Sequence, residues 1–187
     1  MLRVVLWINL AMFVVEFGAG LVAHSTALLA DSVDMLGDAI VYGFSLYVVG
    51  KGSQWQARGA LLKGGIMAIF AAGIAMEIIL KLSRGVTPDG ELMSGIALLA
   101  LAANAAVLIF LWRHRSDDLN MRSAWLCSRN DVVANAAVLL AAGAVWLSGS
   151  PWPDIAVGVG IAGLFGSSAI AIIRQALHAR GLSLVSS

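Results

Sequence analysis

The sequence has few of the residues on which soluble folds depend. Its single cysteine, Cys127, allows no disulfide within the chain. Charged residues make up 12% of the 187 residues, whereas a soluble domain carries about 25%. The net charge of +1 predicts no polyanionic partner, so nucleic-acid binding is not expected. No nucleophile–base–orienter set or cofactor motif is present, which argues against an enzyme.

The sequence consists largely of long apolar runs. Hydrophobic residues make up 60% of the chain, and six stretches are long enough to cross a lipid bilayer as helices. The prediction is an all-α polytopic membrane protein with six transmembrane helices. Residues 1–175 are expected to form one six-helix transmembrane domain, followed by a short cytoplasmic tail at 176–187. The expected spans are residues 4–23, 27–50, 60–80, 92–112, 123–147 and 155–173.

Basic residues predict the orientation of these spans. Nine fall on one side of the expected bundle, and only Lys81 and Arg84 on the other, with Arg129 inside a span. Loops rich in Lys and Arg stay in the cytoplasm, so both termini are expected there. The expected location is a multi-pass membrane position, in the bacterial inner membrane.

The second expected span carries three acids. Asp31, Asp34 and Asp38 lie within eight residues of an otherwise apolar stretch. A charge at the centre of a membrane helix costs several kcal/mol at least, and such residues commonly serve ions or protons. Asp34 and Asp38 are four apart and share one helix face. The alternative is a structural role, pairing with a buried Arg or forming a polar core.

Two other spans carry polar groups. Glu16 in the first either forms a hydrogen bond between helices or lines a proton or cation path. Cys127, Asp131 and Asn135 are spaced by four and form one polar stripe in the fifth span. Cys127 is either a metal ligand or a small buried hydrophobe. Asp31, Glu16 and Asn135 are the candidates for a proton or cation pathway.

The second and fifth spans run in opposite directions, so their polar pairs can meet at similar depth. Asp34, Asp38, Cys127 and Asp131 would then supply four donors, which suit a tetrahedral divalent ion such as zinc. A thiolate favours the softer ions zinc and cadmium. All four donors also bind protons, so metal binding and proton release are linked.

Two further patterns predict structure. Glu77 lies one turn before Lys81, which favours an ion pair within one helix. Gly158, Gly160 and Gly163 have the spacing of a dinucleotide fingerprint, but no strand precedes them. Close helix packing is the expected role of these glycines.

At these residues the chain resembles the cation diffusion facilitators, a family of metal/proton antiporters. The resemblance runs from His24-Ser25 through Asp38, from Leu119-Asn120 through Asn135, and into Pro153-Asp154. Asp34, Asp38 and Asp131 match the metal-binding acids of that family. Cys127 stands where the family usually has His or Asp.

The resemblance implies the following properties. The protein would be a homodimer with one site per protomer, exporting zinc or cadmium from the cytoplasm by alternating access, with protons as the counter-ion and no cofactor. Family members usually carry a cytoplasmic ferredoxin-like domain after the sixth helix, so the chain resembles a short form without it.

Two other functions remain as alternatives. A passive divalent-cation channel would need weak binding at several sites, whereas one tight set of four donors favours a carrier. A non-transporting or regulatory partner subunit could lose those donors, but this chain retains four candidates.

Overall fold

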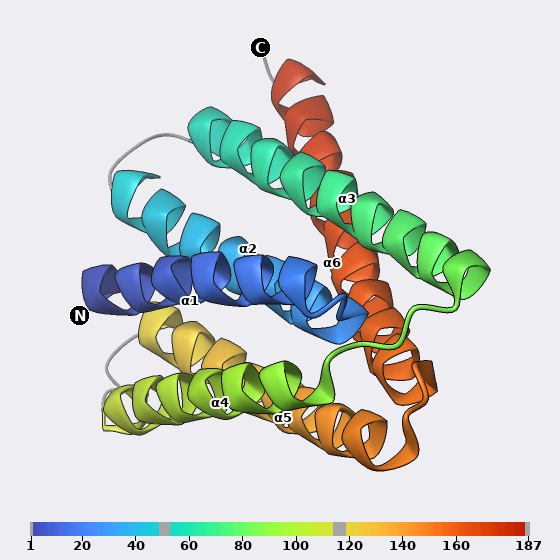
Figure 1. The fold of residues 1–187 in the computed structure, drawn as a ribbon. Helices are drawn as coiled ribbons and strands as arrows, with labels where there is room; N and C mark the ends of the chain where they lie inside the picture. The colour runs from blue at the N-terminus through green and yellow to red at the C-terminus, as the bar shows by residue number, and fades with distance from the viewer. Residues whose placement is uncertain (1, 49–52, 114–118, 186–187) are drawn as a thin grey trace.

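The part of the chain that the structure describes forms six helices (Figure 1). The computed structural model describes all residues except 1, 49–52, 114–118 and 186–187. Within those described ranges every regular element is a helix, which confirms the all-α class. The helices are α1 (Leu2–Val22), α2 (Thr26–Val48), α3 (Ser53–Arg84), α4 (Gly90–Trp112), α5 (Leu119–Ser148) and α6 (Trp152–Val185).

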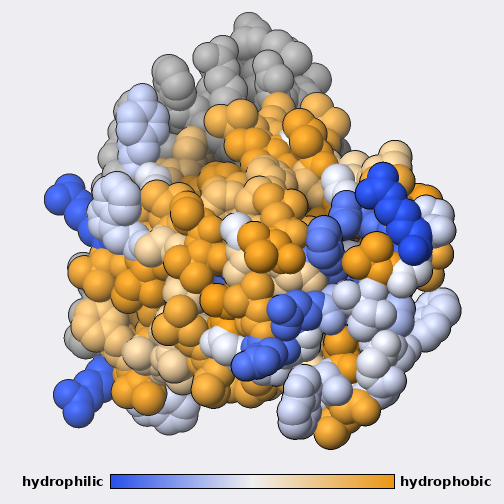
Figure 2. Space-filling view, viewed as in Figure 1, coloured by the Kyte–Doolittle hydropathy of each residue, from blue (hydrophilic) through white to orange (hydrophobic). Residues whose placement is uncertain are grey.

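Five of the helices are long and apolar enough to cross a membrane, namely α1, α3, α4, α5 and α6. The helix α2 is also long enough to cross a membrane, at 23 residues. It differs from those five because every 18-residue stretch of it contains all three of its aspartates. Large apolar side chains point outward, among them Leu140 at 76% and Ile69 at 73% exposure, and apolar side chains cover most of the face in Figure 2. A soluble monomer rarely exposes so much continuous apolar surface, so this surface faces lipid.

The helix α2 has the most neighbours. The most extensive pairings join α1 to α2, α4 to α5 and α3 to α6, and α2 also contacts α3, α5 and α6. Every residue from 25 to 33 is buried. Asp31 is therefore surrounded by protein, as acids within a membrane almost always are.

Several helices extend beyond their predicted ends. The helix α3 begins at Ser53 and α5 at Leu119, inside segments predicted as loops, and α6 continues to Val185, so the predicted tail is mostly helical. Hydropathy marks where the hydrocarbon ends, whereas a helix ends where the backbone hydrogen bonding stops. Residues 53–58 and 174–179 contain no Gly or Pro to stop it.

Three turns gather at one end of the bundle, which we call the hairpin end. The backbone is left-handed at His24, Gly85 and Gly149, with φ of 52°, 64° and 63°. The Asp89 N–H donates to the Ala23 carbonyl across two of these turns, at 3.0 Å. The short turn between α1 and α2 confirms the predicted hairpin.

One of the three glycines in α6 allows the close packing expected of them. A Cβ at Gly158 would lie 2.9 Å from Thr26 Oγ1 and 3.0 Å from the Thr26 carbonyl carbon, whereas nothing lies within 4 Å at Gly160 or Gly163. The backbone of α2 therefore approaches α6 directly at Gly158, as small residues permit in membrane bundles.

Gly158→Ala is expected to lower stability. Overpacking costs about 1–3 kcal/mol, which outweighs the gain of up to about 1 kcal/mol in helix propensity. Gly95→Ala is the matched control, because Gly95 is exposed with nothing within 4 Å of the added Cβ. In detergent, the midpoint temperature of thermal unfolding should be lower for Gly158→Ala than for wild type, and for Gly95→Ala it should be equal to or higher than that of wild type. Equal midpoints for the two variants would contradict the close contact.

Candidate metal centre

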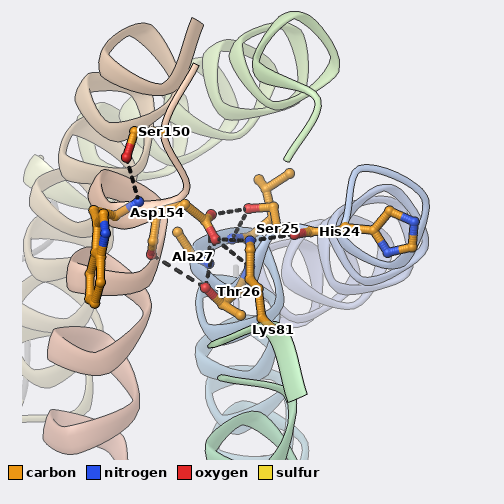
Figure 3. Close-up of polar contacts among 9 residues, drawn as sticks. His24, Ser25, Thr26, Ala27, Lys81, Ser150 and Asp154 are labelled. Carbon is orange, nitrogen blue, oxygen red and sulfur yellow. Dashed lines mark hydrogen bonds and ion pairs between the residues drawn. The ribbon is translucent and has the colours of Figure 1, made fainter. Parts of the chain in front are cut away.

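The first turn of α2 is held by a carboxylate from another helix. Asp154, in the first turn of α6, accepts the N–H of Thr26 at 2.9 Å and of Ala27 at 3.1 Å. It also accepts the hydroxyls of Ser25 at 2.5 Å and of Thr26 at 2.6 Å (Figure 3). The first N–H groups of a helix lack partners within it and favour negative charge. Asp154 therefore caps α2 from α6.

Lys81 completes this cluster and corrects one prediction. Its Nζ lies 2.6 Å from Asp154 Oδ2 and donates to the His24 carbonyl at 2.5 Å. The predicted pair of Lys81 with Glu77 is therefore wrong. Lys81 and Asp154 are both buried, and a buried cation gains more from a buried carboxylate and a carbonyl than from a partner on the helix surface.

Three of the predicted metal ligands line one cavity. It measures about 410 Å³ and is lined by Asp34 and Asp38 of α2 and by Asp131 of α5, with Asn130 beside them. Asp38 is 9% and Asp131 4% exposed, and Asp34 is half-buried. The structure thus brings together residues from the two helices whose polar pairs were predicted to meet.

A hydrogen bond orients one of these carboxylates. The Tyr42 hydroxyl donates to Asp38 Oδ2 at 3.0 Å, and such supporting bonds fix the direction in which a carboxylate presents its oxygens. The Asn135 side chain donates to the backbone carbonyl of Asp131 at 2.9 Å and so contacts the backbone of α5 and not the carboxylate. Tyr42 was not singled out from the sequence, although its i+4 spacing from Asp38 is the signal that could have found it.

The complete set of four ligands stays a prediction. The side chain of Cys127 lies outside the described part of the structure, although its backbone belongs to α5. Among the side chains that are described, no three of His, Cys, Asp and Glu form a group that could hold an ion. The three aspartates share a cavity without converging on one point.

The residues predicted for a proton or cation pathway lie deeper. Glu16, Asp31 and Asn135 are buried, at 0%, 1% and 0% exposure, and none of them lines the cavity. Asn135 contacts the site through the Asp131 backbone. Glu16 and Asp31 form a separate pair between α1 and α2.

Comparison with known proteins identifies the family. The cation efflux transmembrane domain matches residues 2–179. The chain belongs to the cation efflux family. The resemblance to the cation diffusion facilitators is confirmed, and the family is one of transporters.

Two curated members of the cation efflux family match over most of this chain. One is the metal cation efflux system protein CzcD of Cupriavidus metallidurans, 24% identical over 170 residues, covering 84% of this chain and 54% of the relative. The cation efflux system protein CzcD of an Alcaligenes strain matches to the same extent. The chain spans about half the length of these relatives.

Proposed function

We propose that this protein exports a divalent metal ion, zinc or cadmium, from the cytoplasm in exchange for protons. The observation that carries the proposal is the cavity that Asp34, Asp38 and Asp131 line, inside a protein of the cation efflux family. Cys127 would supply the fourth donor. The chain would lie in a bacterial inner membrane with both termini in the cytoplasm.

The chemistry of the site accounts for exchange. Carboxylates and a thiol must lose their protons to bind a metal, so each ion that enters releases protons and each that leaves takes them up. Three carboxylates that line one cavity repel one another when the metal has gone, which favours protons on them. The membrane potential also acts on the exchange, by about 2.3 kcal/mol per 100 mV for each elementary charge that crosses the membrane.

The test is a flux assay in proteoliposomes with a pH gradient and a panel of divalent ions. Saturable zinc or cadmium transport, with protons moving in the opposite direction, is expected. Flux that does not saturate and ignores the pH gradient would indicate a passive channel instead. No flux of any ion would indicate a non-transporting partner subunit.

A homodimer held through the membrane helices is part of the proposal. Gly160 and Gly163 leave an exposed small-residue face on α6, which permits a second copy to approach closely. Mass measurement in nanodiscs should give two chains per particle. A monomer that still transports would contradict this.

The metal preference is expected to depend on Cys127. Cys127→His should keep zinc transport and lower the cadmium-to-zinc ratio, because thiolate favours the softer ion. Cys127→Ser should weaken transport of both ions by at least about tenfold, because changing even a residue that only supports a ligand lowers metal affinity or activity by that factor. Because a free thiol titrates near about 8.5, metal binding should weaken as the pH falls.

The measurement is the cadmium-to-zinc transport ratio of each variant under one pH gradient. An unchanged ratio in Cys127→His, together with full activity in Cys127→Ser, would make Cys127 a packing residue. The three aspartates would then need water or Asn135 to complete the site.

A further inference from the structure

Two buried carboxyl groups face each other across the first hairpin. Glu16 lies eight residues before the turn at His24 and Asp31 seven residues after it, so the antiparallel α1 and α2 bring them to a similar level. Their exposures are 0% and 1%, and they lie within hydrogen-bonding reach of each other. None of their four oxygens has a hydrogen-bond donor among the described atoms.

Among the residues that the structure describes, no basic group neutralises this pair. The described charged groups that act on it are Asp34 on α2 and Asp131 on α5, both acids. Lys81 is engaged by Asp154 and by the His24 carbonyl.

The other packed elements supply no counter-charge within the described residues. The helix α4 has one charged group, Glu91, exposed in its first turn. Arg129 of α5 is exposed, and its guanidinium lies 5.7 Å from the Trp125 ring centroid.

Two adjacent carboxylates cannot both stay ionised under these conditions. An isolated buried charge is too costly to keep without a partner, and two like charges at one site raise that cost further. A proton on one oxygen removes the second charge and turns that oxygen into a donor for the other carboxylate. One bound proton therefore resolves both the repulsion and the missing hydrogen bond.

A metal ion does not fit the pair. Zinc takes four ligands and calcium six to eight, whereas only two residues converge here and no third His, Cys, Asp or Glu among the described side chains joins them. A proton needs only two oxygens. We propose that Glu16 and Asp31 form a dedicated proton site, separate from the aspartates that take the metal.

The neighbours of the pair connect it to the cavity. A divalent ion bound beside Asp34 and Asp131 would place two positive charges near the pair. The shared proton would then leave, the pair would change from one negative charge to two, and the metal would offset the added charge. This coupling rests on the proposed function, whereas the bound proton does not.

Infrared spectroscopy tests the proton site without reference to transport. Metal-free protein near neutral pH, in a detergent without ester carbonyls, should show a carboxylic-acid C=O band. One component of the band should shift in Glu16→Gln and in Asp31→Asn and be lost in the double variant, which keeps the component from protonated aspartates of the metal cavity. Glu91→Gln, which alters an exposed acid, should leave the whole band unchanged. Spectra identical to wild type in both single variants and in the double variant would overturn the proposal, and monodisperse elution of each variant checks its fold.

Calorimetry tests the coupling. Metal-binding heats in buffers of different ionisation enthalpy give the number of protons released per ion. Wild type and Glu91→Gln should release about one proton more than the double variant, which should still bind the metal. Equal proton counts would overturn the coupling, and a wild type that binds no metal would overturn the proposed function while the infrared result stands.

Discussion

Metal transport is expected to disappear in Asp38→Asn and in Asp131→Asn. Both carboxylates are buried side chains that line the same cavity, and an amide keeps the size of the side chain without its charge. Changing a residue that only supports a metal ligand lowers metal affinity or activity by about 10–100-fold. Losing a ligand itself should therefore lower the transport rate by more than about a hundredfold. Uptake rates in proteoliposomes under a pH gradient give the measurement.

Two further variants make this result specific. Asp89→Asn changes an exposed carboxylate at the start of α4 and should leave transport unchanged. Tyr42→Phe removes the hydroxyl that donates to Asp38 and should reduce transport without abolishing it. Transport at the wild-type rate in either aspartate variant would exclude that residue from the metal site.

Asp154→Ala should cause the largest loss of stability. The change leaves Lys81 as a buried cation without its carboxylate, and removing one partner of a buried ion pair costs about 3–5 kcal/mol. It also removes the acceptor for the first N–H groups of α2. Denaturation in detergent, followed by circular dichroism, should show the loss together with reduced yield of folded protein.

The size of this effect is judged against two milder changes. Lys81→Met leaves Asp154 with its four other hydrogen bonds and should cost less. Asp89→Ala removes an ordinary N-cap, worth about 1 kcal/mol. If Asp154→Ala were no more harmful than Asp89→Ala, the carboxylate would not be what holds α2, α3 and α6 together.

Some of these features follow from the local sequence. The helices of the bundle were visible as apolar runs, and the shared face of Asp34 and Asp38 follows from their i, i+4 spacing. The alternation of directions was enough to predict that Asp131 lies on the same cavity. These features depend on neighbours within one helix or on the thickness of the membrane, which short stretches of sequence encode.

Other features depend on residues far apart in the chain. Lys81 had a plausible partner four residues earlier, and nothing local shows that it bonds instead to Asp154, 73 residues later. The pairing of Glu16 with Asp31 depends on how closely α1 packs against α2. The ends of α3 and α6 passed the predicted limits, because a change in polarity does not end a helix.

The cap that α6 provides for α2 also imposes an order on biosynthesis. Thr26 and Asp154 are separated by 128 residues, which a ribosome adds in on the order of ten seconds. Until then Lys81 has no counter-charge, so we expect the hairpin end to stay open at the membrane surface and to close when the start of α6 arrives. Protease protection of the 85–89 loop in ribosome-bound chains that stop before or after Asp154 would reveal that change.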